Sequence, residues 1–353
     1  MKKINIGIVG LGKIAESVHI PILTNFKEVK LKAAAELNQI RGKRLVKKWN
    51  ISNLYERYEE MYENENLDAI YICLPHHLHF EAVNKALDHG LNVFCEKPMS
   101  TNSDDAHHLV EKAKKYELIL AVGYNRRLKP NFQRAAEIIK SGKLGKIVTV
   151  NGILVNPGPY STWIPSSDWF FNKESGGVLL DSGSHLFDVL TYILDDEIIY
   201  VNTESMNVYK INVFDNIVGS FKTQGETIGT FNIGWGISNQ YDLIQIHGTA
   251  GSLLVSSYEM QEWYGRLTAL DRFVNYLKSA SGILKQALAL RSYKNIRGPY
   301  AEEDRAFIDS LLNRKITPTC TGERALVILE ILDAIRESLT RDQSVKIKTH
   351  FKN

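Results

Sequence analysis

Residues 4–15 read INIGIVGLGKIA, an apolar run that leads directly into a glycine-rich turn. The run Ile4–Val9 is typical of a strand that is covered on both faces of a parallel sheet. Gly10 permits a tight turn, Gly12 lets a pyrophosphate approach the backbone, and Ala15 allows the next helix to pack closely on the strand. The N-terminus of that helix would face the phosphates with its partial positive charge. We therefore expect a dinucleotide cofactor to contact Gly10, Gly12, Lys13, Ile14 and Ala15.

Strand-like and helix-like segments alternate through residues 1–124. The predicted strands are Ile4–Val9, Leu31–Glu36, Ala69–Leu74, Asn92–Cys95 and Ile119–Val122. The predicted helices are Ile14–Asn25, Arg41–Trp49, His79–His89 and Ser103–Tyr116. Alternating units of this size build a doubly wound parallel sheet. We predict an α/β protein in which residues 1–124 form an NAD(P)-binding Rossmann domain.

The rhythm changes in residues 125–353, where strands follow one another without intervening helices. The predicted strands are Lys146–Val155, Ile198–Val208, Asn212–Lys222, Thr227–Trp235, Leu243–His247 and Ser252–Ser256. The predicted helices are Phe132–Lys140, Val178–Leu194, Leu270–Leu290, Glu302–Asn313 and Gly322–Leu339. This order predicts an antiparallel or mixed sheet, and hence an α+β second domain.

Composition excludes several classes of protein. The chain of 353 residues has 44% hydrophobic and 24% charged residues, which is ordinary for a globular protein. No apolar run approaches the roughly 18–20 residues that cross a bilayer, so we expect no integral membrane segment. The net charge of +3 is too small to indicate a nucleic-acid partner. The three cysteines form no CxxC pair, which argues against a disulfide framework or a zinc site and favours the cytoplasm.

Glu36 lies at the end of the second predicted strand, where an acidic residue can accept hydrogen bonds from the adenosine ribose hydroxyls and repel a 2′-phosphate. Leu37 and Asn38 follow it, instead of the arginine of an NADP enzyme. We therefore favour NAD, while Arg41 and Lys43 leave NADP open as an alternative.

Two further groups of residues carry chemistry. Lys97, in Glu96-Lys97-Pro98, directly follows a predicted strand, and ligands of doubly wound sheets bind beyond the carboxyl ends of strands. Asp181, His185 and Asp188 are spaced i, i+4 and i+7 on a predicted helix, which places them on one face. A carboxylate one turn from an imidazole can fix its tautomer, as a general base requires.

These stretches together resemble the Gfo/Idh/MocA family of oxidoreductases. The resemblance rests on the glycine turn, Asp68–Pro75 with His79, Glu96-Lys97-Pro98, Gly123–Arg127, residues 176–188 and Ile246–Ser252. It implies a catalytic trio in which His185 removes the hydroxyl proton, Lys97 hydrogen-bonds the reacting oxygen, and Asp181 binds a substrate hydroxyl or orients His185. The further residues expected near the cofactor are Glu36, Leu74, Pro75, His79, Glu96, Lys97 and Asn125. Arg127 is expected at the substrate, with pairing to a carboxylate as its alternative.

The resemblance implies that residues 125–353 form a domain with a largely antiparallel, open sheet, which binds substrate and mediates oligomerisation. It also implies a dehydrogenase that acts on a sugar, a polyol or a nucleotide sugar, as a homodimer or homotetramer. Two alternatives remain open. One is an NAD-dependent glycosidase that oxidises a sugar transiently, and the other is a regulatory protein that senses the dinucleotide without turnover. The presence of Lys97, Asp181 and His185 together argues against the sensor.

Three remaining segments have open interpretations. His76, His77 and His79 stand where a strand meets a helix, and we expect no metal there. Trp163 and Trp169 could stack on a sugar ring or plug the space between domains. A segment at about 262–298 has seven basic residues and one acid between Arg266 and Arg297. It could be a helical excursion packed on the body or at a subunit contact, a lid over a phosphorylated or nucleotide-linked sugar, or a helix on an anionic membrane surface.

Overall fold

The computed structural model describes residues 3–158, 168–238, 240–264, 294–313 and 320–348. These residues form two compact units, Met1–Tyr124 with Tyr300–Leu329 and Asn125–Pro299 with Glu330–Asn353. Among the described residues, no helix is both long and apolar enough to cross a membrane. The predicted helix Leu270–Leu290 and most of the basic segment lie outside the described residues.

The first unit is built on a seven-stranded sheet in the order β14-β6-β5-β4-β1-β2-β3. Its strands are β1 (Ile4–Val9), β2 (Val29–Ala35), β3 (Asn53–Tyr55), β4 (Ala69–Ile72), β5 (Asn92–Glu96), β6 (Leu120–Gly123) and β14 (Cys320–Thr321). All neighbours are parallel except β14, which pairs antiparallel with β6. The strand order reverses at β1 and β4, which is the switch point where such sheets bind ligands. The predicted Rossmann sheet is confirmed.

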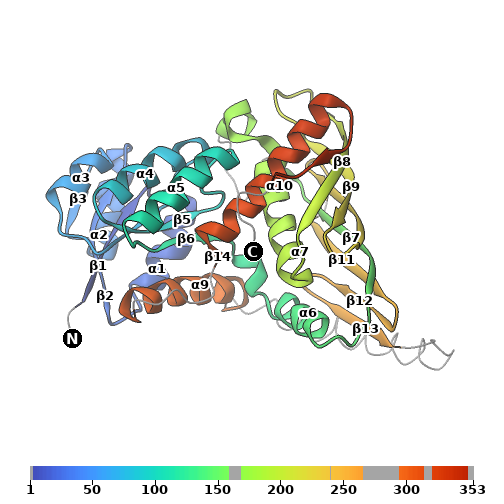
Figure 1. Cartoon of the computed structure of the whole chain (residues 1–353). Helices are drawn as coiled ribbons and strands as arrows, with labels where there is room; N and C mark the ends of the chain where they lie inside the picture. The colour runs from blue at the N-terminus through green and yellow to red at the C-terminus, as the bar shows by residue number, and fades with distance from the viewer. Residues whose placement is uncertain (1–2, 159–167, 239, 265–293, 314–319, 349–353) are drawn as a thin grey trace. The chain divides into compact units, whose positions relative to one another are not determined.

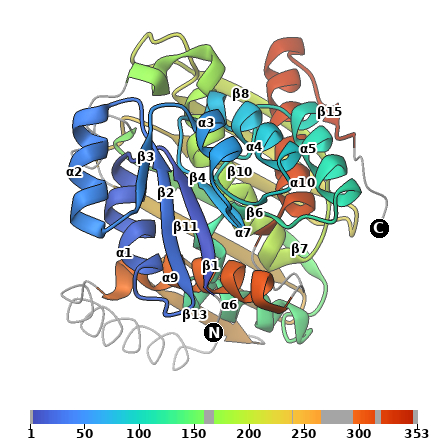
Figure 2. The same ribbon diagram turned by 90° about the vertical axis from the view of Figure 1, so that its left-hand side faces the viewer.

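Helices cover both faces of this sheet. They are a π turn at Ala15–His19, α1 (Ile20–Leu23), α2 (Gln39–Trp49), α3 (Tyr58–Asn64), a 3₁₀ turn at His76–Leu78, α4 (His79–Asp88), α5 (Ser103–Lys115) and α9 (Lys294–Asn313). The pair α4 and α5 lies on one side of the strands, and α1 and α9 lie on the other (Figure 1). Figure 2 shows the same arrangement from the side of β1 and β2.

The segment Tyr300–Leu329 groups with the first unit, although the sequence interpretation placed it in the second domain. Phe307 and Ile308 of α9 are fully buried in the same core as Tyr71 and Phe94. The rings of Phe307 and Tyr71 meet edge to face at 5.5 Å. The apolar pattern of a helix shows that one face is buried, but it does not show which core buries it.

The second unit contains an eight-stranded sheet in the order β13-β12-β11-β7-β10-β9-β8-β15. Its strands are β7 (Ile147–Val155), β8 (Ile198–Met206), β9 (Asn216–Thr223), β10 (Ile228–Gly234), β11 (Tyr241–Gly248), β12 (Gly251–Val255), β13 (Met260–Tyr264) and β15 (Val345–Lys346). Only β7 and β10 pair in parallel. The predicted, largely antiparallel sheet is therefore confirmed.

Helices lie along one face of this second sheet. Besides 3₁₀ turns at Asn125–Leu128, Asp168–Phe171 and Lys173–Ser175, they are α6 (Pro130–Lys140), α7 (Ser184–Leu194) and the latter part of α10 (Gly322–Arg341). Within the described part of the unit, the other face carries no helix (Figure 1). Side chains on or beside the sheet that remain exposed include Tyr200, Val218, Ile228 and Tyr241.

The helix predicted near Val178–Leu194 is present, but its first turn is not a regular α-helical one. Leu179–Gly183 form a π turn, and the regular helix α7 starts at Ser184. Gly183 lies in this turn, where a Cβ atom would come within 3.0 Å of the Ile233 side chain. The wider turn therefore brings backbone close to the sheet. It also shifts Asp181 relative to His185 from the i, i+4 geometry that a regular helix would give.

Candidate active site

The glycine turn has the geometry that a dinucleotide requires. Gly10 has φ +82°, and a Cβ atom there would lie 2.6 Å from the carbonyl oxygen of Cys73. Only glycine adopts this conformation at that distance without strain. A Cβ atom at Gly12 would meet nothing within 4 Å, so the backbone faces open space. Ala15 is fully buried. The turn fits a pyrophosphate at the start of the following helix.

Glu36 is buried, at 5% exposed, and its carboxylate is already engaged within the protein. Oε2 accepts the backbone N–H of Leu11 at 2.8 Å, which ties the carboxylate to the glycine turn. Oε1 accepts the backbone N–H of Asn38 and an N–H of Arg41, each at 2.8 Å. Glu36 therefore lies against the glycine turn with the Arg41 guanidinium directly beside its carboxylate, and its role as the ribose-binding acid stays a prediction.

His79 is fully buried and supports the loops around the turn. Its Nδ1 lies 2.6 Å from the carbonyl oxygen of Pro98, and its Nε2 lies 2.7 Å from that of Leu74. Burial lowers the pKa of His79. A neutral imidazole donates from only one nitrogen, so His79 holds one carbonyl at a time. The imidazole therefore lies between the loop after β4 and the loop after β5.

Lys97 directly follows β5 and is half-buried. Its backbone N–H donates to Glu96 Oε2 at 3.2 Å. The other Glu96 oxygen receives a hydrogen bond from His19 Nε2 at 2.9 Å. The sequence analysis missed His19, which stands in the π turn that begins the first helical segment.

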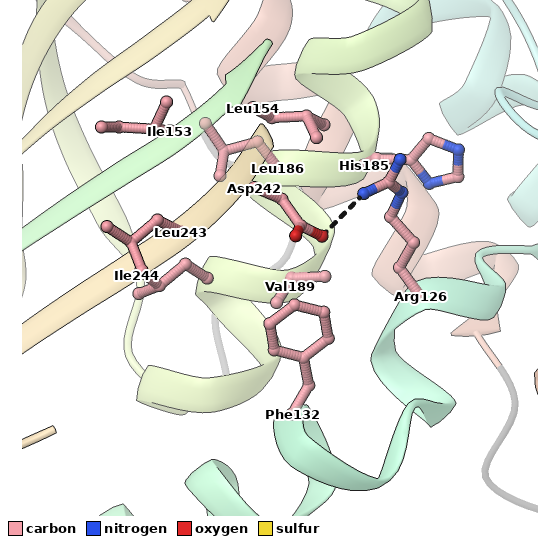
Figure 3. Close-up of a pocket in the computed structure, with 10 residues that line it drawn as sticks. All are labelled: Arg126, Phe132, Ile153, Leu154, His185, Leu186, Val189, Asp242, Leu243 and Ile244. Atoms are coloured by element: carbon pink, nitrogen blue, oxygen red, sulfur yellow. Dashed lines mark hydrogen bonds and ion pairs between the residues drawn. The ribbon is translucent and has the colours of Figure 1, made fainter. Parts of the chain in front are cut away.

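Asp181 and His185 of the second unit are both half-buried. Ser182 Oγ lies 3.4 Å from Asp181 Oδ2 and accepts a hydrogen bond from Asn156 Nδ2 at 3.0 Å. His185 lines a pocket whose other walls include Arg126 and Asp242 (Figure 3). The remaining lining residues are Phe132, Ile153, Leu154, Leu186, Val189, Leu243 and Ile244.

Arg126 and Asp242 are the charged residues in the lining of this pocket, and the sequence analysis selected neither as a site residue. Arg126 Nη1 donates to Asp242 Oδ2 at 3.1 Å (Figure 3), and Arg126 lines the same pocket as His185. Asp242 also accepts a short hydrogen bond from the Ser257 hydroxyl. The only indication in the sequence was the pair of adjacent arginines in Gly123–Arg127, and the pattern does not show which one faces the pocket.

Arg127, which was expected at the substrate, is instead buried against Asp188. Its Nε donates to the two Asp188 oxygens at 3.0 and 3.3 Å, and its Nη2 donates to Oδ1. The guanidinium also lies over the Tyr192 ring, 5.4 Å from its centroid. These contacts favour the alternative that Arg127 pairs with a carboxylate. Asp188 is therefore assigned to holding α7, which carries His185.

The other predicted site residues have less specific surroundings. Asn125 is buried in the second unit, and Leu74 and Pro75 are half-buried after β4. Trp169 stacks on Phe170, whose ring meets Trp235 edge to face. Trp163 lies outside the described residues.

Comparisons with known proteins bear on both units. Residues 4–124 match the oxidoreductase family with an NAD-binding Rossmann fold, and residues 132–254 match the GFO/IDH/MocA C-terminal domain. The chain is 27% identical over 349 residues to the myo-inositol 2-dehydrogenase of Thermotoga maritima, across 97% of this chain and 98% of that protein. It is 26% identical over 200 residues to the scyllo-inositol 2-dehydrogenase (NAD(+)) of Bacillus subtilis, across 57% of this chain and 56% of that protein.

Solved structures share the complete fold. Levoglucosan dehydrogenase in complex with NADH and levoglucosan matches with a TM-score of 0.83 at 20% identity, across 99% of this chain and all of that one. The Rossmann sheet, its glycine turn and the second α/β unit define an NAD-binding oxidoreductase. More narrowly, the chain belongs to the Gfo/Idh/MocA family.

Proposed function

We propose that this protein is an NAD(P)-dependent dehydrogenase that acts on a CH–OH group of a sugar, a polyol or a nucleotide sugar, with NAD as the preferred cofactor. The observation that supports it most is that one unit supplies a hydrogen-bond donor, the Lys97 ammonium, and the other supplies a proton acceptor, the His185 imidazole. Lys97 follows β5 at the ligand-binding edge of the Rossmann sheet. His185 and Asp181 stand at the start of α7 in the second unit. Two relatives named as inositol dehydrogenases support a polyol or sugar substrate.

The residues divide the chemistry between them. When bound, NAD supplies the hydride acceptor. His185 takes the proton from the substrate hydroxyl as general base, and Asp181 holds a neighbouring hydroxyl or orients the imidazole. The Lys97 ammonium donates a hydrogen bond to the reacting oxygen, which stabilises negative charge as it develops there. Arg126, in the same pocket as His185, is suited to bind a further substrate oxygen.

Oligomerisation and location belong to the same proposal. The helix-free face of the second sheet carries exposed Val218, Ile228 and Tyr241, which suit a contact between subunits of a homodimer or homotetramer. The three cysteines form no disulfide, which supports a reducing cytoplasm.

A screen of NAD reduction tests the proposal with sugars, inositols, sugar phosphates and nucleotide sugars. Lys97→Ala and His185→Ala are each expected to lower kcat about 100-fold or more, because a positioned proton donor or acceptor contributes roughly 10²–10⁴-fold. Lys30→Ala and His89→Ala remove exposed side chains of the same types and serve as controls. Equal activity in the wild type and both site variants would remove the assignment. Glycoside cleavage without net NADH would indicate the glycosidase reaction, and NAD binding without turnover on any compound would indicate the sensor.

A further inference from the structure

We propose that His19 is a positioning residue for Lys97, acting through Glu96 and held in place by Asp304. The inference rests on the proposed role of Lys97. It concerns residues of the first unit only, and it adds a residue from near the end of the chain to the machinery of the nucleotide-binding unit.

His19 connects two carboxylates in a fully buried position. Its Nδ1 lies 2.9 and 3.1 Å from the two oxygens of Asp304 in α9. Its Nε2 lies 2.9 Å from Glu96 Oε1 at the end of β5. The side chains of His19 and Asp304 are both 0% exposed, and that of Glu96 is 12% exposed. Such short contacts fix the orientation of the imidazole on both sides.

When Glu96 and Asp304 are ionised, His19 donates from both ring nitrogens, because a carboxylate only accepts hydrogen bonds. Burial raises the pKa of Asp304, and the charge and hydrogen bond of His19 act against that shift. Burial acts to lower the pKa of His19, but Asp304 and Glu96 outweigh burial and raise that pKa well above its ordinary value. The titratable groups that face this cluster are Tyr71, Cys73, Glu96, Tyr300, Glu303 and Asp304. An imidazolium among these acids is the stable form near neutral pH.

Glu96 transmits this restraint to Lys97. One carboxylate oxygen is held by His19, and the other accepts the Lys97 backbone N–H at 3.2 Å. A Cβ atom at Gly123 would lie only 3.3 Å from Glu96 Oε2, so glycine leaves room for the carboxylate. With both oxygens engaged, Glu96 has one orientation. The backbone from which the Lys97 side chain starts is therefore fixed as well.

A bound metal ion is the competing interpretation of the cluster. Ligand atoms of His19, Glu96 and Glu303 lie within 4.8 Å of one another. A metal, however, needs the lone pair of an imidazole nitrogen, whereas both nitrogens of His19 carry protons toward carboxylates. The distances of 2.9 Å from His19 to Glu96 and to Asp304 are those of charge-assisted hydrogen bonds.

The first test replaces His19 by glutamine, with His108→Gln as a matched control on the exposed surface of α5. In His19→Gln we expect kcat to fall about 10- to 100-fold, as displacement of a catalytic group by about 1 Å would produce. The Kd for NADH, from its fluorescence, should change less than about threefold, since the glycine turn is intact. Removing the imidazolium charge should also move the midpoint of the pH–kcat/KM profile upward by about 0.5–1 unit. An unchanged kcat and an unchanged midpoint would overturn the proposal.

A double-mutant cycle tests whether the residues act as one unit. Glu96→Gln should lower kcat by a similar factor, and the double variant should be no worse than the poorer single variant. Independent, multiplicative losses would contradict the proposed connection. If His19→Gln does not fold, Asp304→Asn takes its place in the cycle, because it keeps the imidazole and removes the carboxylate that holds it.

A measurement without turnover separates this inference from the proposed function. The rate at which an amine reagent labels Lys97, followed by mass spectrometry in the apoprotein, should differ at least about threefold between the wild type and His19→Gln, because the surroundings of the ammonium change. If the wild type turns over no substrate but this difference is present, the proposed function fails and the positioning stands. If the wild type is active but Lys97 is labelled at the same rate in the wild type and in His19→Gln, the positioning role of His19 is refuted and the proposed function stands. Inactivation by EDTA that Zn²⁺ reverses would also overturn it, in favour of a metal centre.

Discussion

Replacement of Arg127 by methionine should destabilise the protein strongly. The side chains of Arg127 and Asp188 are 5% and 0% exposed, and the guanidinium donates to both carboxylate oxygens. Methionine fills much of the same volume but leaves the Asp188 charge buried without its partner. Breaking a buried ion pair from one side costs about 3–5 kcal/mol. At roughly 2–4 °C per kcal/mol for a domain of this size, Tm should fall by about 6–20 °C.

Differential scanning fluorimetry measures this change, and urea unfolding gives the free energy. The double variant Arg127→Met/Asp188→Leu removes both charges and should recover most of the loss. Arg134→Met is the matched control, because Arg134 is exposed and pairs with Glu137 at the surface. An exposed pair contributes at most about 1 kcal/mol.

The result also decides between the two roles considered for Arg127. A Tm within about 2 °C of the wild type, together with a raised KM for the substrate, would refute the structural role and return Arg127 to the substrate site. For Arg127→Met we expect the opposite result. Its Tm should fall by the amount given above, and the KM of the fraction that stays folded should change little.

Two further predictions concern the cofactor and pH. Replacing Glu36 by serine should weaken NADH binding and shift the ratio of NADPH affinity to NADH affinity about tenfold or more toward NADPH. The reason is that Arg41 loses its carboxylate partner and can face a 2′-phosphate. An unchanged ratio in fluorescence titrations would contradict this prediction. Burial, with help from Arg126, lowers the pKa of Lys129 to about 8, below its unfolded value of about 10.4. Between these values the unfolded chain binds the extra proton, so the stability of the wild type should rise with pH by an amount on the order of 1–3 kcal/mol relative to Lys129→Met. Urea unfolding of both proteins at pH 7.5 and 10 measures this difference. If the free energy of unfolding changes equally with pH in the wild type and in Lys129→Met, the prediction is wrong.

The sequence predicted the parts of the fold that depend on local pattern. The strand β1, the glycine turn and Glu36 are close in sequence, and their spacing carries the physical requirement of the ligand. The short elements β3 and α3 were missed, because three and seven residues give too little periodicity to recognise. The π turn at Leu179–Gly183 was missed because a helical pattern does not show where the turn widens.

The errors at the candidate site have a common cause. Arg126 and Arg127 are adjacent and chemically identical, and only the folded backbone shows that one lines the His185 pocket while the other is buried against Asp188. His19 and Asp304 are separated by 285 positions, so no local pattern joins them. Long-range pairing of polar side chains is decided by tertiary packing, which the spacing of residues in one segment does not encode.

The helix α9 and the strand β14 complete the first unit, although they lie late in the sequence. This order affects when the first unit can fold during synthesis. On the ribosome, the first 124 residues emerge long before Phe307, Ile308 and the edge strand Cys320–Thr321 are synthesised. Until then Tyr71 and Phe94 lack the Phe307 ring that packs against both of them in the folded first unit. A stop codon placed after β13 would leave the glycine turn and both segments that match the family, residues 4–124 and 132–254, in the translated chain. The translated product would still lack Phe307, Ile308 and the edge strand β14, so the core of its nucleotide-binding unit would be incomplete.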